Sequence, residues 1–339
     1  MCAHLVDLER PPRRPFAPER VFDWQAWLPG LIVLAVVVLA SLHFSETREF
    51  VRVAERARPL WLLAALSLQT LTYAAQGEVF RGPAKLRKVE LRMATVYRLS
   101  LMKLFLDQAF PSLGLSGTVA VARELKHAGV PRALVATCVV ISIVSFQLAY
   151  ATAVVTAVPI IVAHRGANAV LIAAAVFFAL AVSAWSAVVL ALSKRRSPLP
   201  RTLVRLRPLR ELLEFVKEAD AALTGDVWSL TRATCCQLAI VVLDAATVWV
   251  LLLSLGEVVP PDIAFASFML ASMSKTVGVV PGGLGTFEAM AVAALNVAGV
   301  SVPVALSATV MFRGLSFWLP MLIGLVLYRG GRVQPCATR

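Results

Sequence analysis

Residues 281–288 read Pro281-Gly282-Gly283-Leu284-Gly285-Thr286-Phe287-Glu288 and interrupt an apolar stretch that is otherwise almost continuous. In hydrocarbon every backbone N–H and C=O group needs an internal partner, so a broken helix survives only where it packs in protein or lines a polar cavity. A carboxylate at that depth is also costly, which makes Glu288 a candidate functional residue. The alternative is a turn in water between two spans, since Gly and Pro also punctuate ordinary loops.

The rest of the chain has the composition of a polytopic membrane protein. Of its 339 residues, 59% are hydrophobic, and the mean hydropathy is +0.77. A helix needs about 20 residues to cross about 30 Å of hydrocarbon. Six segments are long enough, and they are residues 27–44, 60–77, 133–162, 168–192, 233–255 and 302–328. We therefore predict an all-α transmembrane domain over residues 27–328, with polar tails at 1–26 and 329–339 and with the first segment retained as a span.

The net charge of +13 does not indicate a nucleic-acid-binding protein, because the basic residues follow the membrane topology. Nine lie in the loop at residues 193–232 and seven in residues 81–103. Both regions are expected in the cytoplasm by the positive-inside rule, and both chain ends then face the cytoplasm as well. Within the loop, residues 201–223 have the pattern of an amphipathic helix on the membrane surface, and an ordinary linker helix is the alternative.

Two stretches, residues 93–128 and 262–300, fit poorly as simple spans but correspond to each other at an offset of 170 residues. Pro111 falls on Pro281, and the Ala-Gly-Val triplet at residues 128–130 falls on the one at residues 298–300. Each stretch reads as half-helix, Pro/Gly break and half-helix, and a long apolar segment follows. We therefore predict two re-entrant helical hairpins. The alternative for residues 93–110 is a normal span of poor hydrophobicity.

The charge distribution predicts that the two hairpins are inverted. The first begins and ends among basic residues and should enter from the cytoplasm, and an odd number of spans separates it from the second. The copies would then be related by a pseudo-two-fold axis in the membrane plane, as in many transporters, whose broken helices meet near the midplane and form the substrate site.

Four ionisable side chains fall at membrane depth in the second half of the chain: Asp244, Lys275, Glu288 and Arg313. Charges at such depth require pairing or a wet cavity. We expect Glu288 and Arg313 to form a bridge that closes one side of a cavity. A fixed ion pair that only holds two helices is the alternative, since a Glu near a helix start is favoured by the helix dipole in any case.

The predicted half-helix ends suit an anionic ligand. Helix N-termini after Pro111 and Pro281 present free N–H groups and a positive dipole end. Glycines allow a ligand to approach the backbone closely. The expected substrate-binding residues are Pro111, Gly114, Gly117, Arg123, Lys275, Pro281, Gly282, Gly283, Gly285, Glu288 and Arg313.

Other kinds of chemistry lack a sequence signal. No Walker lysine follows Gly285, so an ATP-driven pump is unsupported. The five cysteines and four histidines show no metal-ligand spacing, no catalytic motif is present, and we expect no cofactor, no metal and no enzymatic activity.

The residues quoted above also carry a family resemblance. Residues 281–288, the run Arg313-Gly-Leu-Ser-Phe-Trp-Leu-Pro320-Met-Leu-Ile-Gly324 and the earlier run around Pro111 closely resemble the membrane region of lysylphosphatidylglycerol synthase/flippase proteins, also called the flippase-like or UPF0104 family. The resemblance covers residues 27–330. It implies that Pro281, the following glycines, Glu288 and Arg313 belong to a central site. Many members have a basic residue before the Glu, where this chain has Phe287.

The resemblance implies a stand-alone member in a bacterial cytoplasmic (inner) membrane. Members of the resistance-factor type also carry a cytosolic aminoacyl-transferase domain, which is not present here, so synthase activity is not implied. The first functional hypothesis is a flippase for an anionic or modified phospholipid or an isoprenoid-linked lipid. The alternatives are a non-transporting subunit that docks a lipid-modifying enzyme or glycosyltransferase through residues 193–232, and a membrane-embedded transferase. Oligomerisation is left open.

Overall fold

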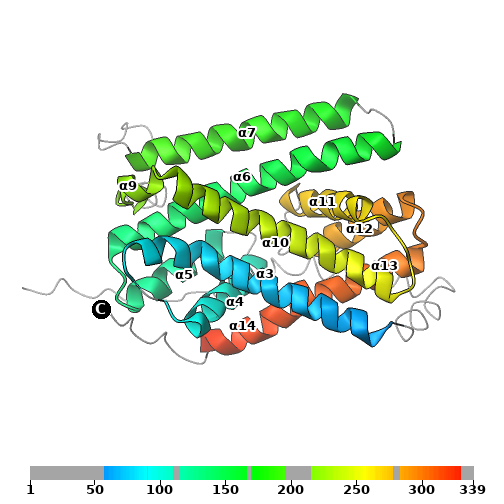
Figure 1. Cartoon of the computed structure of the whole chain (residues 1–339), viewed down its shortest axis with the longest axis horizontal. Coiled ribbons are helices and arrows are strands. Elements are labelled where there is room, and N and C mark those ends of the chain that lie inside the picture. The colour runs from blue at the N-terminus through cyan, green and yellow to red at the C-terminus, as the bar shows by residue number, and fades with distance from the viewer. Residues whose placement is uncertain are drawn as a thin grey trace, which may run out of the picture.

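The computed structural model describes residues 57–89, 91–109, 115–165, 169–194, 215–277 and 283–329. These residues form an all-α bundle (Figure 1). The elements in chain order are α3 (Pro59–Leu86), α4 (Met93–Ala109), α5 (Leu115–His127), α6 (Arg132–Arg165), α7 (Ala169–Lys194), α9 (Ala221–Thr224), α10 (Val227–Ser254), α11 (Pro261–Val277), α12 (Thr286–Val297), α13 (Val302–Arg313), the π-helix η3 (Gly314–Trp318) and α14 (Leu319–Arg329).

Several predicted features lie outside the described residues. They are the tail at 1–26, the span at 27–44, residues 195–214 of the basic loop, the tail from 330, and the site residues Pro111, Gly114, Pro281 and Gly282.

Among the described helices, three are long and apolar enough to cross a membrane by length and composition. They comprise Arg132–His164, Val227–Ser254 and Val302–Gly324, and they match three of the predicted spans. The predicted segment 60–77 falls within α3, and residues 169–192 of the predicted segment 168–192 fall within α7. The all-α membrane fold is thus as predicted, while the number of spans stays a prediction.

Local sequence signals fix where several helices begin. The Asp226 side chain accepts hydrogen bonds from the backbone N–H groups of Trp228 and Ser229 and so caps α10. α3 and α11 each begin with a proline, whose missing N–H is not needed in the first turn.

Both predicted breaks separate two helices that pack against each other. α4 ends at Ala109 and contacts α5, which begins at Leu115. α11 ends at Val277 and contacts α12, which begins at Thr286. α13, η3 and α14 then follow one another without interruption, as the single long segment predicted at 302–328, although the sequence did not predict its π-helical turn.

The helices in the two halves of the sequence correspond at the offset of 170 residues. If 170 is subtracted from the first residue numbers of α10, α11, α12 and α13, each result lies within two residues of the first residue of α3, α4, α5 and α6, respectively. Contacts between helices correspond as well. α6 packs on α11 of the second hairpin, and α14, in the long segment that corresponds to α6, packs on α4, which corresponds to α11.

The same helix cap ends α5 and α12. Gly129 (φ 84°) and Gly299 (φ 95°) take the left-handed conformation that glycine adopts most readily. The N–H of the residue after each glycine donates to a carbonyl inside the helix, that of Leu125 in α5 and that of Leu295 in α12, at 3.1 and 3.0 Å. This is the Schellman arrangement, and it accounts for the repeated Ala-Gly-Val triplet.

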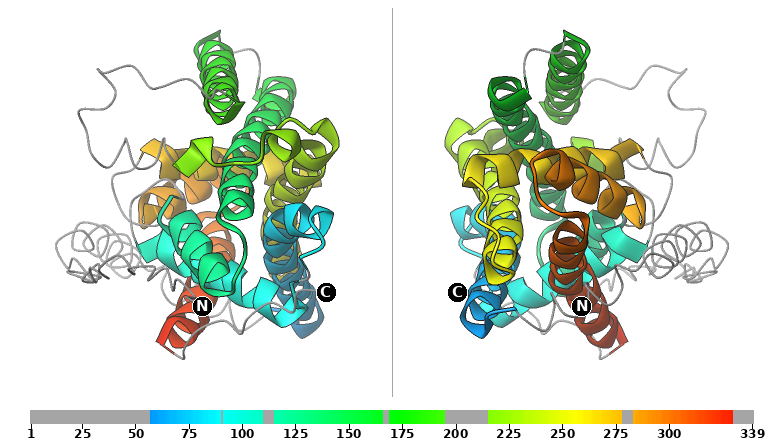
Figure 2. Two further views of the ribbon diagram at one scale, coloured as in Figure 1. Left: turned by 90° about the vertical axis from the view of Figure 1, so that its left-hand side faces the viewer. Right: turned by 90° about the vertical axis from the view of Figure 1, so that its right-hand side faces the viewer.

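The corresponding helices α3 and α10 are antiparallel neighbours. The N–H of Arg58, just before α3, donates to the carbonyl of Ser254 at the end of α10, and Gln69 further along α3 reaches Asp244 of α10. Figure 1 shows the two helices side by side and running in opposite directions. The end views in Figure 2 place α7 on the outside, where it packs on α6.

Candidate functional site

Glu288 stands in the first turn of α12, where the helix resumes after the second break. Gly285 precedes the helix with φ 80°, and its N–H donates to Oε2 of Glu288 at 2.7 Å. A carboxylate at the third helical position that reaches back to the cap N–H satisfies a donor that the helix cannot. The negative charge is further stabilised by the positive end of the α12 dipole. The local geometry thus fixes the Glu288 carboxylate at the start of α12.

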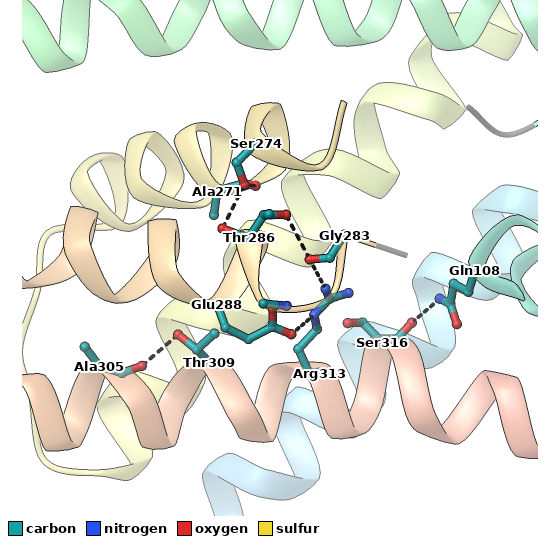
Figure 3. Close-up of polar contacts among 11 residues, drawn as sticks. Gln108, Ala271, Ser274, Gly283, Thr286, Glu288, Ala305, Thr309, Arg313 and Ser316 are labelled. Atoms are coloured by element: carbon teal, nitrogen blue, oxygen red, sulfur yellow. Dashed lines mark hydrogen bonds and ion pairs between the residues drawn. The ribbon is translucent and has the colours of Figure 1, made fainter. Parts of the chain in front are cut away.

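The other oxygen of Glu288 forms an ion pair with Arg313 at the end of α13. Nε of Arg313 donates to Oε1 of Glu288 at 2.6 Å, and a terminal guanidinium nitrogen donates to the carbonyl of Gly283 at 3.0 Å (Figure 3). The exposed fractions of the Arg313 and Glu288 side chains are 6% and 4%. The bridge expected from the sequence therefore exists and ties the last membrane helix to the second break. That it binds substrate stays a prediction.

Aromatic rings surround the guanidinium. Arg313 lies over the rings of Phe287 and Phe317, at 4.7 and 4.9 Å from their centroids. The ammonium of Lys275 lies 4.6 Å from the Phe287 centroid. Both cations are thus placed against the negative face of aromatic rings, which stabilises charge where water is scarce. Phe287, which replaces the basic residue expected from the family resemblance, supplies a ring shared by two cations.

Lys275 and Gly283 lie against each other across the second break. A Cβ added to Gly283 would lie 2.4 Å from Cγ of Lys275, and Gly283 has φ 63°. A glycine is therefore required at this position both for space and for backbone conformation. Among the described residues, no ion pair joins Lys275 to a carboxylate, so its charge is held near Glu288 and Arg313 without a direct partner.

The π-helix η3 begins immediately after Arg313. A π-turn disturbs the regular hydrogen-bond ladder and occurs often at functional sites. Two of its carbonyls accept from side chains of other helices, that of Leu315 from the Tyr73 hydroxyl at 2.6 Å and that of Ser316 from the Gln108 amide at 2.9 Å. Figure 3 shows Gln108 approaching Ser316 beside the ion pair.

Tyr73 and Gln108 were missed by the sequence reasoning. A signal did exist for Tyr73, because Gln69, Thr72, Tyr73 and Gln76 recur at helical spacing within an otherwise apolar segment. Gln108 had no comparable signal, since its partner is a backbone carbonyl freed by the unpredicted π-turn.

The first break is organised around Asp107. One of its oxygens accepts from the N–H of Gly117 at 2.7 Å, and the other pairs with the Lys103 ammonium at 2.7 Å. A Cβ on Gly117 would lie 2.3 Å from the Lys103 carbonyl oxygen, so α5 approaches α4 closely at this glycine. Arg123 is exposed on α5, and within the described residues no hydrogen bond or ion pair joins it to Glu288 or Arg313.

The two hairpins meet next to the ion pair. Phe105 and Leu106 of the first hairpin pack in one buried cluster with Leu284 of the second and with Phe317 of η3. The predicted site residues of the second break are joined by the contacts described above, and they are Lys275, Gly283, Gly285, Glu288 and Arg313. Gly117 lies in the first hairpin, which reaches Leu284 of the second break through Phe105 and Leu106.

A small cavity lies behind Phe287 rather than at the ion pair. Its lining includes Phe268, Phe287, Leu295 and Phe312 and is almost wholly apolar. Such a surface does not suit a charged headgroup, so the cavity is not a candidate for the predicted substrate site.

Comparisons with known proteins show the family to which the chain belongs. The family described as the lysylphosphatidylglycerol synthase TM region matches residues 27–324. A UPF0104 membrane protein from Methanocaldococcus jannaschii is 20% identical over 314 residues, which cover 87% of this chain and 92% of that protein. The match spans both hairpins, the ion pair and η3. The chain therefore belongs to the family of the lysylphosphatidylglycerol synthase TM region, a family of integral membrane proteins.

Proposed function

We propose that this protein moves a lipid with an anionic headgroup between the two leaflets of a bacterial cytoplasmic membrane, without altering the lipid chemically. The substrate class comprises anionic or modified phospholipids and isoprenoid-linked phosphates. The observation that carries the proposal is the buried Glu288–Arg313 pair, with Lys275 beside it, at the point where two broken-helix hairpins meet. Buried charges inside a membrane domain indicate a substrate or ion pathway.

The arrangement of the helices supports an inverted repeat. α3 and α10 correspond at the offset of 170 residues, are neighbours and run in opposite directions. Two equivalent helices in an inverted repeat are related by a two-fold axis in the membrane plane, and broken helices near such an axis form the substrate site in many transporters. We propose that α4–α5 enters from the cytoplasm and α11–α12 from the outside.

The charges at the second break favour an anionic ligand. Two cations, Lys275 and Arg313, lie over the ring of Phe287, and Arg313 pairs with Glu288. A phosphate could replace Glu288 as the partner of the guanidinium, because planar guanidinium groups bind phosphate and carboxylate in the same bidentate manner. Exchange of the two partners would loosen α12 from α13 and open a path for the headgroup, while the acyl chains stay in the bilayer.

The family description supports a lipid-related role and names the membrane region of an enzyme that modifies lipids. We propose that the lipid is supplied by such an enzyme or a glycosyltransferase acting at the cytoplasmic face, where the basic residues of the 193–232 loop would also attract anionic lipids.

Reconstitution into liposomes tests the proposal. Vesicles containing the purified protein receive fluorescent phosphatidylglycerol, aminoacylated phosphatidylglycerol or polyprenyl phosphate, and an impermeant quencher reports headgroups in the outer leaflet. If the protein transports a lipid, the quenched fraction of its fluorescence should exceed the half that an outer leaflet alone would give, for at least one of these lipids. Quenching equal to that of protein-free vesicles for every lipid would contradict transport and favour the docking-subunit hypothesis.

A further inference from the structure

A row of buried polar side chains on α3 faces α10 inside the membrane domain. Gln69, Thr72, Tyr73 and Gln76 have exposed fractions of 1, 5, 7 and 6%. Their spacing of three, one and three residues places them on one side of a helix. None of these side chains belongs to the Glu288–Arg313 pair, although Tyr73 reaches the neighbouring η3 through the carbonyl of Leu315. The row therefore requires its own explanation.

Two residues of the row, Gln69 and Thr72, reach Asp244 in the middle of α10. The amide nitrogen of Gln69 donates to Oδ1 of Asp244 at 2.9 Å, and the Thr72 hydroxyl lies 3.5 Å from the same oxygen. Among the described residues, no cation forms an ion pair with Asp244, in contrast to Glu288 with Arg313. At membrane depth, a charged carboxylate that is held only by neutral donors is costly. Binding a cation would compensate its charge, and binding a proton would remove it.

Gln69 carries an acceptor that the ionised carboxylate cannot satisfy. Its Oε1 is buried and has no hydrogen-bond partner among the described residues, although the same amide contacts Asp244 and Thr247. An ionised carboxylate only accepts, whereas a protonated one offers an O–H donor. Rotation of the amide by half a turn would direct Oε1 to that donor, while Nε2 would move to the position that Oε1 now occupies.

Other ionisable groups face this site from the helices around it. Tyr73 and Lys275 are close enough to Asp244 for a direct electrostatic interaction. Lys275 and Arg313 share the ring of Phe287, which places Lys275 beside the ion pair. Tyr73 lies on α3 and Lys275 on α11, so these two groups come from different helices.

We propose that Asp244 is a proton-binding site that couples proton movement to lipid transport. The step adds one proton to the carboxylate and forms the carboxylic acid, and no other bond changes. Loss of the negative charge makes the electrostatic potential around Lys275 more positive, which favours an anionic headgroup at the second break. Proton binding itself rests on the geometry around Gln69, and only its coupling to the headgroup rests on the proposed function.

Infrared spectroscopy of the protein in lipid bilayers tests proton binding without any transport. Between about pH 5 and about pH 9, a range in which an ordinary aspartate is ionised throughout, we expect a carbonyl-stretch band of a protonated carboxyl that titrates. The band should disappear in Asp244→Asn and persist in Glu78→Gln, a matched loss of a carboxylate that is paired with Arg81 elsewhere on α3. Absence of an Asp244-dependent band from the wild-type spectrum over this range would overturn the proposal.

Two additions keep the test decisive. If Asp244→Asn does not fold, Gln69→Leu should shift the midpoint of the wild-type band, and an unchanged midpoint contradicts the proposed pairing.

In proteoliposomes, one pH unit across the membrane, worth a factor of about 10 for one proton, should change the wild-type translocation rate several-fold and leave the Asp244→Asn rate unchanged. Translocation that is insensitive to the gradient overturns the coupling, whereas no translocation by any variant overturns the proposed function and leaves the infrared result standing.

Discussion

Arg313 donates to Glu288 at 2.6 Å and thereby joins the last membrane helix to the first turn of α12. Both side chains are almost fully buried, and the guanidinium also binds the carbonyl of Gly283. One residue of α13 therefore holds both ends of the segment between Gly283 and Glu288. The stability of the second break should depend on this single cation.

Replacing either partner should destabilise the protein. Removing one member of a buried ion pair leaves the other charge uncompensated and costs about 3–5 kcal/mol. Glu288→Gln and Arg313→Gln should each lower the thermal midpoint of the detergent-solubilised protein. The double variant should lose much less than the sum of the two, because no lone charge remains. Additive losses would show that the two side chains do not act as a pair.

Gly283 should tolerate no side chain. Gly283→Ala combines a left-handed backbone, worth about 1–2 kcal/mol, with a clash against Lys275. Gly129→Ala is the matched control, because Gly129 has φ 84° but open space around its Cβ position. Thermal unfolding should show a larger loss for Gly283→Ala than for Gly129→Ala. Equal losses would mean that the contact with Lys275 does not exist.

Gly324 allows α14 to approach the first hairpin. A Cβ at this position would lie 2.7 Å from the Leu101 carbonyl oxygen and 2.6 Å from Cβ of Phe105. Small residues at helix interfaces permit such close packing in membranes. Gly324→Ala should therefore destabilise the protein. Gly314→Ala, at a position with right-handed backbone angles and nothing within 4 Å of an added Cβ, should be neutral or stabilise it by about 0.5–1 kcal/mol. A neutral Gly324→Ala would contradict the described packing of α14 on α4.

The inverted arrangement makes a prediction about membrane sidedness. His127 and Val297 are exposed residues in the last turns of α5 and α12 and correspond at the offset of 170 residues. In a chain without its native cysteines, His127→Cys should react with an impermeant thiol reagent from the cytoplasmic side only. Val297→Cys should react from the outside only. Reaction of both from the same side would exclude the inverted repeat.

The sequence predicted much of this fold because hydrocarbon imposes strong rules on it. Long apolar segments, the repeated Ala-Gly-Val triplet and the Pro/Gly breaks each reflect one local requirement, namely span length, a Schellman cap or an interrupted helix. The Glu288–Arg313 pair could also be predicted, since two isolated charges at similar depth must find a partner.

Other parts of the site depend on tertiary contacts that no local pattern encodes. The π-turn after Arg313 has no sequence signature of its own, and so Gln108, which binds one of its carbonyls, could not be recognised. The shared role of Phe287 could not be predicted either, because Lys275 and Arg313 reach its ring from two different helices. Arg123 was assigned to the site from its proximity in sequence, and the structure leaves it exposed on α5.

The most direct measurement of the central claim is headgroup translocation in liposomes by three variants compared with the wild type. Removal of a charge at the second break should reduce the rate at least tenfold in Glu288→Gln and in Lys275→Gln, provided that both proteins elute as folded species. Glu78→Gln, which removes a carboxylate away from the break, should translocate lipid at the wild-type rate. Translocation at the wild-type rate by folded Glu288→Gln and Lys275→Gln would contradict a substrate path past these charges.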